Sequence, residues 1–134
     1  MNEPSPPSRR RFAVATAATL AAASYSRVLG ANERVRLGFV GVGNRGTNLL
    51  NGTKEFGDQQ IVAVCDLLDP LLDRAASAAG TDPARYKDYR RLLDRPDIDA
   101  VVVATPDHWH ALMTIAACRA GKDVYVEKPL SLTV

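Results

Sequence analysis

A glycine-rich segment near residue 40 constrains the fold more than any other feature of the chain. Residues 41–46 read Gly-Val-Gly-Asn-Arg-Gly, follow the apolar run 35–40 directly, and open a helical pattern. In such a turn Gly41 permits a tight bend, Gly43 lets the backbone approach a pyrophosphate, and Gly46 lets the helix pack on the strand. The free N–H groups at the start of the helix favour an anionic ligand. The segment therefore predicts a βαβ unit that binds a dinucleotide.

An acid stands at the position that such a site requires. Asp66 ends the second apolar run and lies 20 residues after Gly46, where a carboxylate can hydrogen-bond the adenosine ribose. A carboxylate there suits a free 2′-hydroxyl and repels a 2′-phosphate, which favours NAD. NADP stays open, because the Arg45 guanidinium could reach a phosphate from the loop. Asn44 and Arg45 join the three glycines and Asp66 as candidate cofactor-binding residues.

From Arg34 onward, short apolar runs alternate with helical patterns. Strands are expected at 35–40, 61–65, 100–105 and 124–126, with a short one near 85–87. Helices are expected at 44–53, 69–79 and 89–94, with Asp69 as the N-cap of the second. Another is expected from Asp107, its cap, to Gly121, with Trp109, Leu112, Met113, Ala116 and Ala120 on one face. This alternation predicts an α/β fold, a Rossmann-type doubly wound parallel sheet, in one domain over 31–134.

The first thirty residues differ from the rest in charge and composition. They carry four arginines against one glutamate, whereas the other 104 residues carry 13 basic and 14 acidic side chains. Three arginines at 9–11 precede the run 12–23, which has ten apolar residues and two threonines. This order is typical of a secretory signal, and the paired arginines resemble the twin-arginine signal of bacteria. We predict a signal peptide over 1–30, export by the twin-arginine machinery and a periplasmic location.

Two details of this leader stay open. Cleavage after Ala23, after Ser26 or near Gly30 fits the small residues there. A buried Ala-rich helix of the mature fold is the alternative to a signal peptide.

Composition excludes several classes of protein. Apolar residues make up 46% and charged residues 24% of the chain, as in folded globular proteins, which excludes a wholly disordered chain. No apolar run reaches the roughly 20 residues of a membrane span. A net charge of +2 is too small to indicate a nucleic-acid partner. Two cysteines exclude a disulfide-stapled miniprotein, and we expect Cys65 and Cys118 to be small core residues without a disulfide.

Two further segments follow predicted strands, at the sheet edge where ligands bind in open α/β folds. They are Thr-Pro-Asp-His-Trp-His at 105–110 and Glu-Lys-Pro at 127–129. With the glycine loop and Asp66 in the same order, the chain over about 34–134 resembles a known family. This is the oxidoreductase family of glucose–fructose oxidoreductase, inositol dehydrogenase and rhizopine catabolism (Gfo/Idh/MocA), in its N-terminal half.

The resemblance implies a Rossmann domain that is followed by a second α/β domain, and hydride transfer to or from sugars, cyclitols or related hydroxyl and carbonyl compounds. It implies pyrophosphate binding by the glycine loop, ribose binding by Asp66, and a nicotinamide-facing loop and lysine segment. The residues of these last two parts are Thr105, Pro106, His110, Glu127, Lys128 and Pro129. Lys128 and His110 are the candidate catalytic residues. We expect the second domain to be absent from a chain that stops at Val134, and this chain alone to be inactive.

Alternatives remain for single residues. An ammonium at Lys128 would stabilise alkoxide charge and help move a hydroxyl proton, and the alternative is a solvated lysine. A cis peptide at Pro129 would suit a tight turn. His108 and His110 are two residues apart, unlike the i, i+4 spacing of helical metal pairs, so no metal site is expected. Trp109 is expected to pack rather than to stack on substrate.

Two other functions stay open at this point. One is a dinucleotide-binding module without catalysis. The other is a glycine-loop S-adenosylmethionine methyltransferase, which the Glu-Lys-Pro segment disfavours. The expected partners are a sugar-like small molecule and the export machinery, and homo-oligomers stay open for a longer parent protein.

Overall fold

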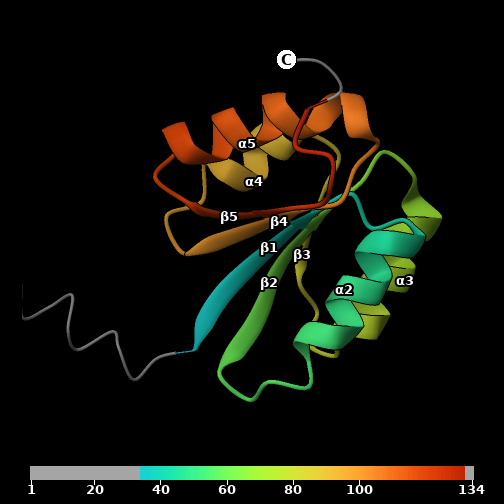
Figure 1. Cartoon of the computed structure of the whole chain (residues 1–134). Helices are drawn as coiled ribbons and strands as arrows, with labels where there is room; N and C mark the ends of the chain where they lie inside the picture. The colour runs from blue at the N-terminus through green and yellow to red at the C-terminus, as the bar shows by residue number, and fades with distance from the viewer. Residues whose placement is uncertain (1–33, 132–134) are drawn as a thin grey trace, which may run out of the picture. The chain divides into compact units, whose positions relative to one another are not determined.

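A computed structural model describes residues 34–131 (Figure 1). The predicted signal peptide at 1–30 lies outside these residues. Within the described part of the chain, no helix is long and apolar enough to cross a membrane, and no group of three or more His, Cys, Asp or Glu side chains could hold a metal.

Five parallel strands form the predicted doubly wound sheet. They are β1 (Val35–Val40), β2 (Gln59–Cys65), β3 (Ala84–Tyr86), β4 (Ala100–Val103) and β5 (Asp123–Val126). Their order in the sheet is β3-β2-β1-β4-β5, so the direction of winding reverses between β1 and β4. Ligands of open α/β sheets bind at such a reversal, outside the carboxyl ends of the strands.

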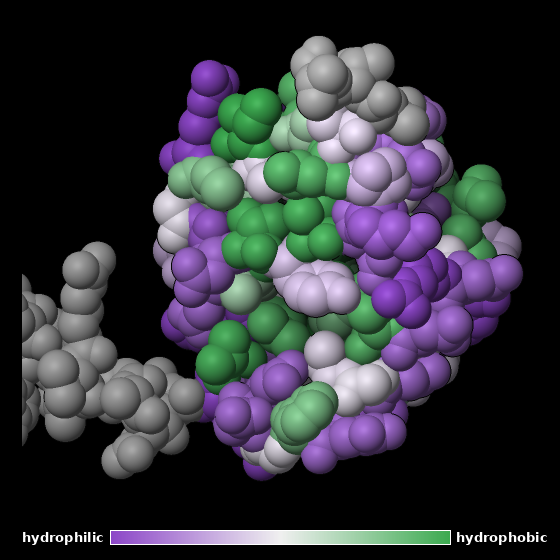
Figure 2. All heavy atoms as spheres, viewed as in Figure 1, coloured by the Kyte–Doolittle hydropathy of each residue, from purple (hydrophilic) through white to green (hydrophobic). Residues whose placement is uncertain are grey.

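Helices cover both faces of the sheet. In Figure 1, α2 (Asn44–Thr53) and α3 (Asp69–Ala79) lie on one side, while α4 (Tyr89–Leu93) and α5 (His110–Arg119) lie on the other. One apolar core fills each interface, because alternate strand residues such as Phe39 and Val40 point to opposite faces. Figure 2 shows apolar side chains in the middle of this view, with hydrophilic side chains around them.

The region before α5 departs from the sequence prediction. Residues Asp107–Trp109 form a short 3₁₀ turn, so Asp107 does not cap the helix, which begins at His110. The buried residues of α5 are His110, Met113 and Ala117, whereas Leu112 is 50% exposed. The predicted apolar face is confirmed at Met113 and at the partly buried Ala116. It is wrong at the exposed Trp109, Leu112 and Ala120, because the spacing from His110 sets the side of the helix that meets the sheet.

Four smaller predictions also need correction. The third strand lies at Ala84–Tyr86, one residue earlier than expected, and β4 ends at Val103. Leu68 rather than Asp69 is the N-cap residue of α3, which places Asp69 in the first turn. Cys65 is buried as expected, but Cys118 is exposed, because its position on α5 points away from the sheet. Both cysteines are free.

Candidate functional site

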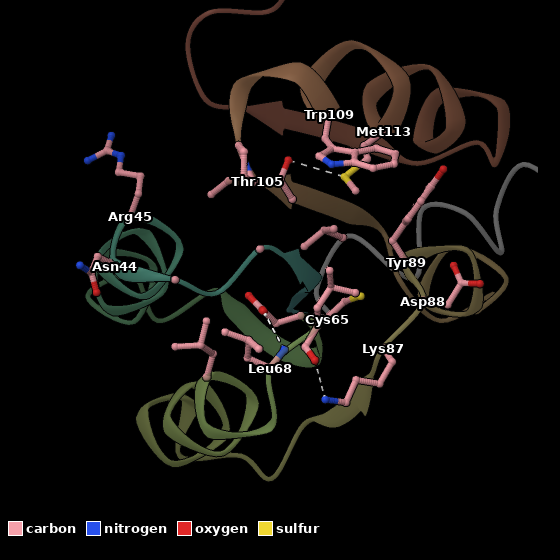
Figure 3. Close-up of a pocket in the computed structure, with 18 of the residues that line it drawn as sticks. Asn44, Arg45, Cys65, Leu68, Lys87, Asp88, Tyr89, Thr105, Trp109 and Met113 are labelled. Carbon is pink, nitrogen blue, oxygen red and sulfur yellow. Dashed lines mark hydrogen bonds between the residues drawn. The ribbon is translucent and has the colours of Figure 1, made fainter.

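A cleft of about 900 Å³ lies along the carboxyl ends of the strands. The loops after β1, β2 and β4 border it, together with the residues that follow β3. In Figure 3, Asn44 and Arg45 lie at one end of the cleft and Lys87 and Asp88 at the other. Leu68 lies across the cleft from Trp109 and Met113, so the slot between them has largely apolar walls (Figure 3).

The glycine loop has the geometry that its spacing predicts. Gly41 has a φ of +83°, and a Cβ there would lie 2.7 Å from the backbone nitrogen of Thr105. A Cβ at Gly46 would overlap the Gly41 carbonyl oxygen, so the first turn of α2 packs directly on the loop. Gly43 borders the cleft, and a Cβ there would have no atom within 4 Å. The loop thus leaves open space at the one glycine where a pyrophosphate must approach.

The start of α2 also suits an anion. Its N-cap residue is Gly43, which has no side chain to accept hydrogen bonds from the first N–H groups. The first turn contains no acidic residue. Helix-terminal N–H groups and the helix dipole are therefore available to a bound anion. These features fit the pyrophosphate of a dinucleotide.

Asp66 lies at the predicted place, at the end of β2 and in the wall of the cleft. One carboxylate oxygen accepts a hydrogen bond from the Val42 N–H at 2.9 Å, and the other accepts one from the Leu68 N–H at 3.2 Å. A carboxylate has about four acceptor positions, so capacity remains for a ribose hydroxyl. Asp66 therefore holds the glycine loop against the turn after β2, a role that the sequence did not indicate.

Arg45 binds Glu127, at the end of β5. Its Nε lies 2.7 Å and its Nη2 lies 2.5 Å from Glu127 Oε1. This contact lowers the pKa of the nearly buried Glu127 carboxyl and raises the pKa of the Arg45 guanidinium. Because β1 and β4 separate β5 from β2, the pair lies on the side of the loop away from Asp66. This geometry gives no support to an Arg45 contact with a 2′-phosphate at the adenosine ribose.

His110 is buried and ties two loops together. Its Nδ1 lies 2.7 Å from the Pro129 carbonyl oxygen, and its Nε2 lies 2.8 Å from the Thr105 carbonyl oxygen. Both partners are acceptors, and a neutral imidazole can donate only one hydrogen bond. Backbone groups thus engage both ring nitrogens. His110 therefore positions the two loops in this structure, and its catalytic role stays a prediction.

Lys128 is exposed beside a second hollow of about 520 Å³, which Arg45, Thr105 and Glu127 also line. The Lys128–Pro129 peptide is cis, an option that the sequence left open. On either side of Lys128, Arg45 binds the Glu127 side chain and His110 binds the Pro129 carbonyl. The segment that carries the predicted catalytic lysine is thus held from two separate elements.

The loop after β4 contributes the remaining predicted residues. Thr105 and Pro106 line the main cleft, and the Thr105 hydroxyl donates to the Met113 sulfur at 3.6 Å. Trp109 is 40% exposed and forms part of the cleft wall, so it does not pack on the buried face of the helix where the sequence placed it. It lies on the exposed 3₁₀ turn rather than on the buried stripe of α5.

Cys65 also borders the cleft, as a buried side chain at the end of β2. Burial, with smaller effects from Asp66 and Asp88, raises the pKa of its thiol to about 12. The thiol therefore stays protonated at neutral pH, which excludes a nucleophilic role.

Sequence reasoning missed part of the cleft wall. The missed residues are Leu67, Leu68, Leu71, Lys87, Asp88, Tyr89 and Arg90. One signal was available: Lys87 and Asp88 directly follow the third strand, whose carboxyl end meets the same sheet edge as Asp66.

Comparison with known proteins agrees with this geometry. Residues 35–134 match the profile of the oxidoreductase family with an NAD-binding Rossmann fold. The chain belongs to the Gfo/Idh/MocA family. It supplies the NAD-binding Rossmann domain of that family, whose characterised structural neighbours are dehydrogenases. This membership sets aside the methyltransferase alternative.

Three relatives illustrate the family. A glycosyl hydrolase family 109 protein of Saccharopolyspora erythraea is 44% identical over 112 residues, which cover 78% of this chain and 24% of that protein. An alpha-N-acetylgalactosaminidase of Shewanella oneidensis is 40% identical over 110 residues, 76% of this chain and 24% of that protein. Myo-inositol dehydrogenase of Lactobacillus casei, solved with NAD(H) and myo-inositol, has a TM-score of 0.70 at 30% identity. That match covers 75% of this chain and 30% of the dehydrogenase.

The chain therefore spans about a quarter of the length of the curated relatives that it matches.

Proposed function

We propose that this domain binds NAD(H) along the carboxyl edge of its sheet and serves an enzyme that transfers hydride to or from a sugar, a cyclitol or a related compound. The observation that carries the proposal is the glycine loop: open space at Gly43, an uncapped helix start, and Asp66 held beside it. With the pyrophosphate at the glycine loop, the adenosine of the cofactor lies near Asp66 and its nicotinamide lies near Lys128. Two similar proteins support a sugar or cyclitol as the substrate. They are the myo-inositol dehydrogenase solved with myo-inositol and the relative named as an alpha-N-acetylgalactosaminidase.

Lys128 is the chain's own contribution to the chemistry. When bound, a nicotinamide ring supplies the carbon that accepts or donates hydride. The exposed Lys128 ammonium, at the end of β5, stabilises negative charge on the reacting oxygen and donates the hydroxyl proton when a carbonyl is reduced. In the oxidation direction, the neutral amine of Lys128 accepts that proton from the hydroxyl. Arg45 and His110 fix the residues on either side of it, so the ammonium is presented from a held segment.

A titration tests the binding step on this chain. Trp109 is the only tryptophan and stands in the cleft wall, so NADH bound there should accept its excitation energy. Gly43→Val should weaken NADH binding by at least about tenfold, because the side chain occupies the pyrophosphate position. The far-ultraviolet circular dichroism should not change, since no atom lies within 4 Å of a Cβ there.

Gly57→Val is the matched control, because a Cβ at Gly57 also has no atom within 4 Å and the residue precedes β2, away from the cleft. It should bind NADH as the unmodified chain does. Equal affinity of Gly43→Val and Gly57→Val would remove the loop from the binding site.

A second candidate function is glycoside cleavage that depends on NAD, which the names of the glycosyl hydrolase relatives favour. Hydrolysis involves no net oxidation, so such an enzyme must return the hydride to the sugar in every turnover. In a chain of the relatives' length, a dehydrogenase would accumulate NADH from a free sugar or cyclitol. A glycosidase would release sugar from an N-acetylgalactosaminide without net NADH. A domain that binds NADH but supports neither reaction would be a dinucleotide-binding module.

Export is a separate part of the proposal. Residues 1–30 direct the protein to the periplasm by the twin-arginine route, which carries folded cargo and so allows the cofactor to bind before export. Arg9→Lys combined with Arg10→Lys should leave folded, cofactor-loaded protein in the cytoplasm, because lysine lacks the planar guanidinium fork. Cell fractionation measures the outcome, and export of the double variant would refute this assignment. Homo-oligomerisation of a longer parent protein is also proposed, and sedimentation of that protein would test it.

A further inference from the structure

A lysine that the dinucleotide site does not explain contacts the turn after β2. Lys87 follows β3, and its Nζ donates to the Leu67 carbonyl oxygen at 2.8 Å and lies 2.6 Å from Asp69 Oδ1. The Lys87 side chain is 48% exposed and lines the same cleft as Asp66 (Figure 3). An ammonium therefore stands at the turn that follows Asp66, the carboxylate proposed to bind the adenosine ribose, and Asp69 already neutralises it.

The charges around this turn disfavour a further anion. Asp66 and Asp69 are negative and Lys87 is positive, so these three groups together carry a net negative charge. The Arg74 guanidinium is engaged nearby, 3.4 Å from the Val42 carbonyl oxygen. Arg90 also lines the cleft, and its Nη1 lies 3.2 Å from Asp88 Oδ1. This pair of residues adds no net charge. A dianionic 2′-phosphate would meet the Asp66 carboxylate, while the nearby ammonium is held by Asp69.

We propose that the Asp69–Lys87 pair is a second determinant of cofactor selectivity, besides Asp66. By binding the ammonium, Asp69 keeps Lys87 from a 2′-phosphate and so disfavours NADP. The inference rests on the proposed function, because it requires the adenosine ribose to lie at Asp66. It assigns the choice of cofactor to a contact between the start of α3 and the loop after β3, in addition to the Asp66 carboxylate.

The pair can be broken without disturbing the core. The Asp69 side chain is 79% exposed and lies in the first turn of α3, and asparagine keeps its size while removing the charge. Without the Asp69 charge, the Lys87 ammonium lines the cleft with no carboxylate bound to it, and its charge suits a phosphate. A Lys87→Met change in the same chain removes that ammonium and keeps an apolar stem of similar length.

The experiment compares affinities for NADH and NADPH, measured by energy transfer from Trp109. Asp69→Asn should raise the affinity for NADPH relative to NADH by about tenfold, the value of one new charge-assisted hydrogen bond. Adding Lys87→Met should abolish this gain. Asp73→Asn is the matched control: it removes a similarly exposed charge from the same helix, but Asp73 pairs with Arg85. Its NADPH to NADH ratio should equal that of the unmodified chain.

Two results would overturn the inference. One is an unchanged ratio in Asp69→Asn. The other is a raised ratio that persists with Lys87→Met, which would mean that the lost charge acts alone. If the unmodified chain bound neither dinucleotide, the proposed function itself would fail, and the inference with it. Circular dichroism of each variant separates a change in selectivity from a loss of fold.

Discussion

At the amino ends of the strands, charged side chains bind backbone carbonyls and one another, whereas at the carboxyl ends they border an open cleft. Before β5, Lys122 Nζ donates to the carbonyl oxygens of Arg95 and Ile98 at 2.6 and 2.9 Å. Arg95 in turn binds both Asp97 oxygens and the Val62 carbonyl. These groups use their hydrogen-bonding capacity within the protein.

At the carboxyl ends of the strands, similar charged groups keep hydrogen-bonding capacity for a ligand. Asp66 has about two acceptor positions beyond its two backbone contacts. Lys128 is exposed beside a hollow, and Lys87 is held by an exposed carboxylate. A charged side chain of this domain therefore serves either stability or ligand binding, according to the partners that its loop supplies.

The largest expected effect tests the packed side of the carboxyl edge. Gly46→Ala should destabilise the domain by about 3 kcal/mol or more, because its Cβ would overlap the Gly41 carbonyl oxygen. NADH binding should be lost with it. Gly52→Ala on the same helix is the control: nothing lies within 4 Å of its Cβ, and alanine should stabilise by up to about 1 kcal/mol. Urea unfolding of both variants measures the difference, and equal stabilities would contradict the close packing of α2 on the loop.

The next effect tests the amino edge. Lys122→Met should cost about 2 kcal/mol, because two part-buried carbonyl oxygens lose a charged donor. NADH affinity of the folded protein should not change, since the contact lies at the opposite end of the strands. Thermal unfolding and the energy-transfer titration measure the two quantities separately. A weaker NADH affinity would break the distinction between the edges.

Asp66→Ala tests a residue that serves both purposes. It should weaken NADH binding by about 1.5–3 kcal/mol and relax discrimination against NADPH. It should also lower stability, because the N–H groups of Val42 and Leu68 lose their acceptor. Titration with both dinucleotides provides the measurement. Tighter binding of NADPH than of NADH by the unmodified chain would refute the assigned preference.

The smallest effect is electrostatic. The hydrogen bond from Arg95 lowers the pKa of Asp97 from 3.8 to about 2. Since the folded pKa is the lower one, the stabilisation is fully present above pH 3.8 and is lost as the pH falls through about 2. Asp97→Asn should therefore lower the free energy of unfolding at pH 7 and have little effect near pH 2. A pH-independent difference in urea unfolding would argue against this pair.

Local pattern was enough to predict much of the sheet and the glycine loop. Apolar runs located β1, β2, β4 and β5, and the glycine spacing predicted the turn at Gly41 and the packing at Gly46. These features depend on neighbours in sequence.

Contacts between distant segments were not predictable in the same way. Arg45 and Glu127 are 82 residues apart. They meet only because β1, which precedes Arg45, and β5, which precedes Glu127, end at the same edge of the sheet. The double contact of His110 likewise depends on where the chain after β5 passes. The Lys87–Asp69 pair requires β3 to lie beside β2. A charged residue in sequence does not reveal which loop will face it.

The sheet order has a consequence for handling the protein. Among the described strands, β5 pairs only with β4, so its outer side presents backbone N–H and C=O groups at a lateral edge. Tyr125 on this strand is 53% exposed. An open edge is a template for strand addition, so the domain is expected to self-associate as its concentration rises. Light scattering across a dilution series would give the concentration below which the domain is monomeric. The titrations described above should be made below that concentration.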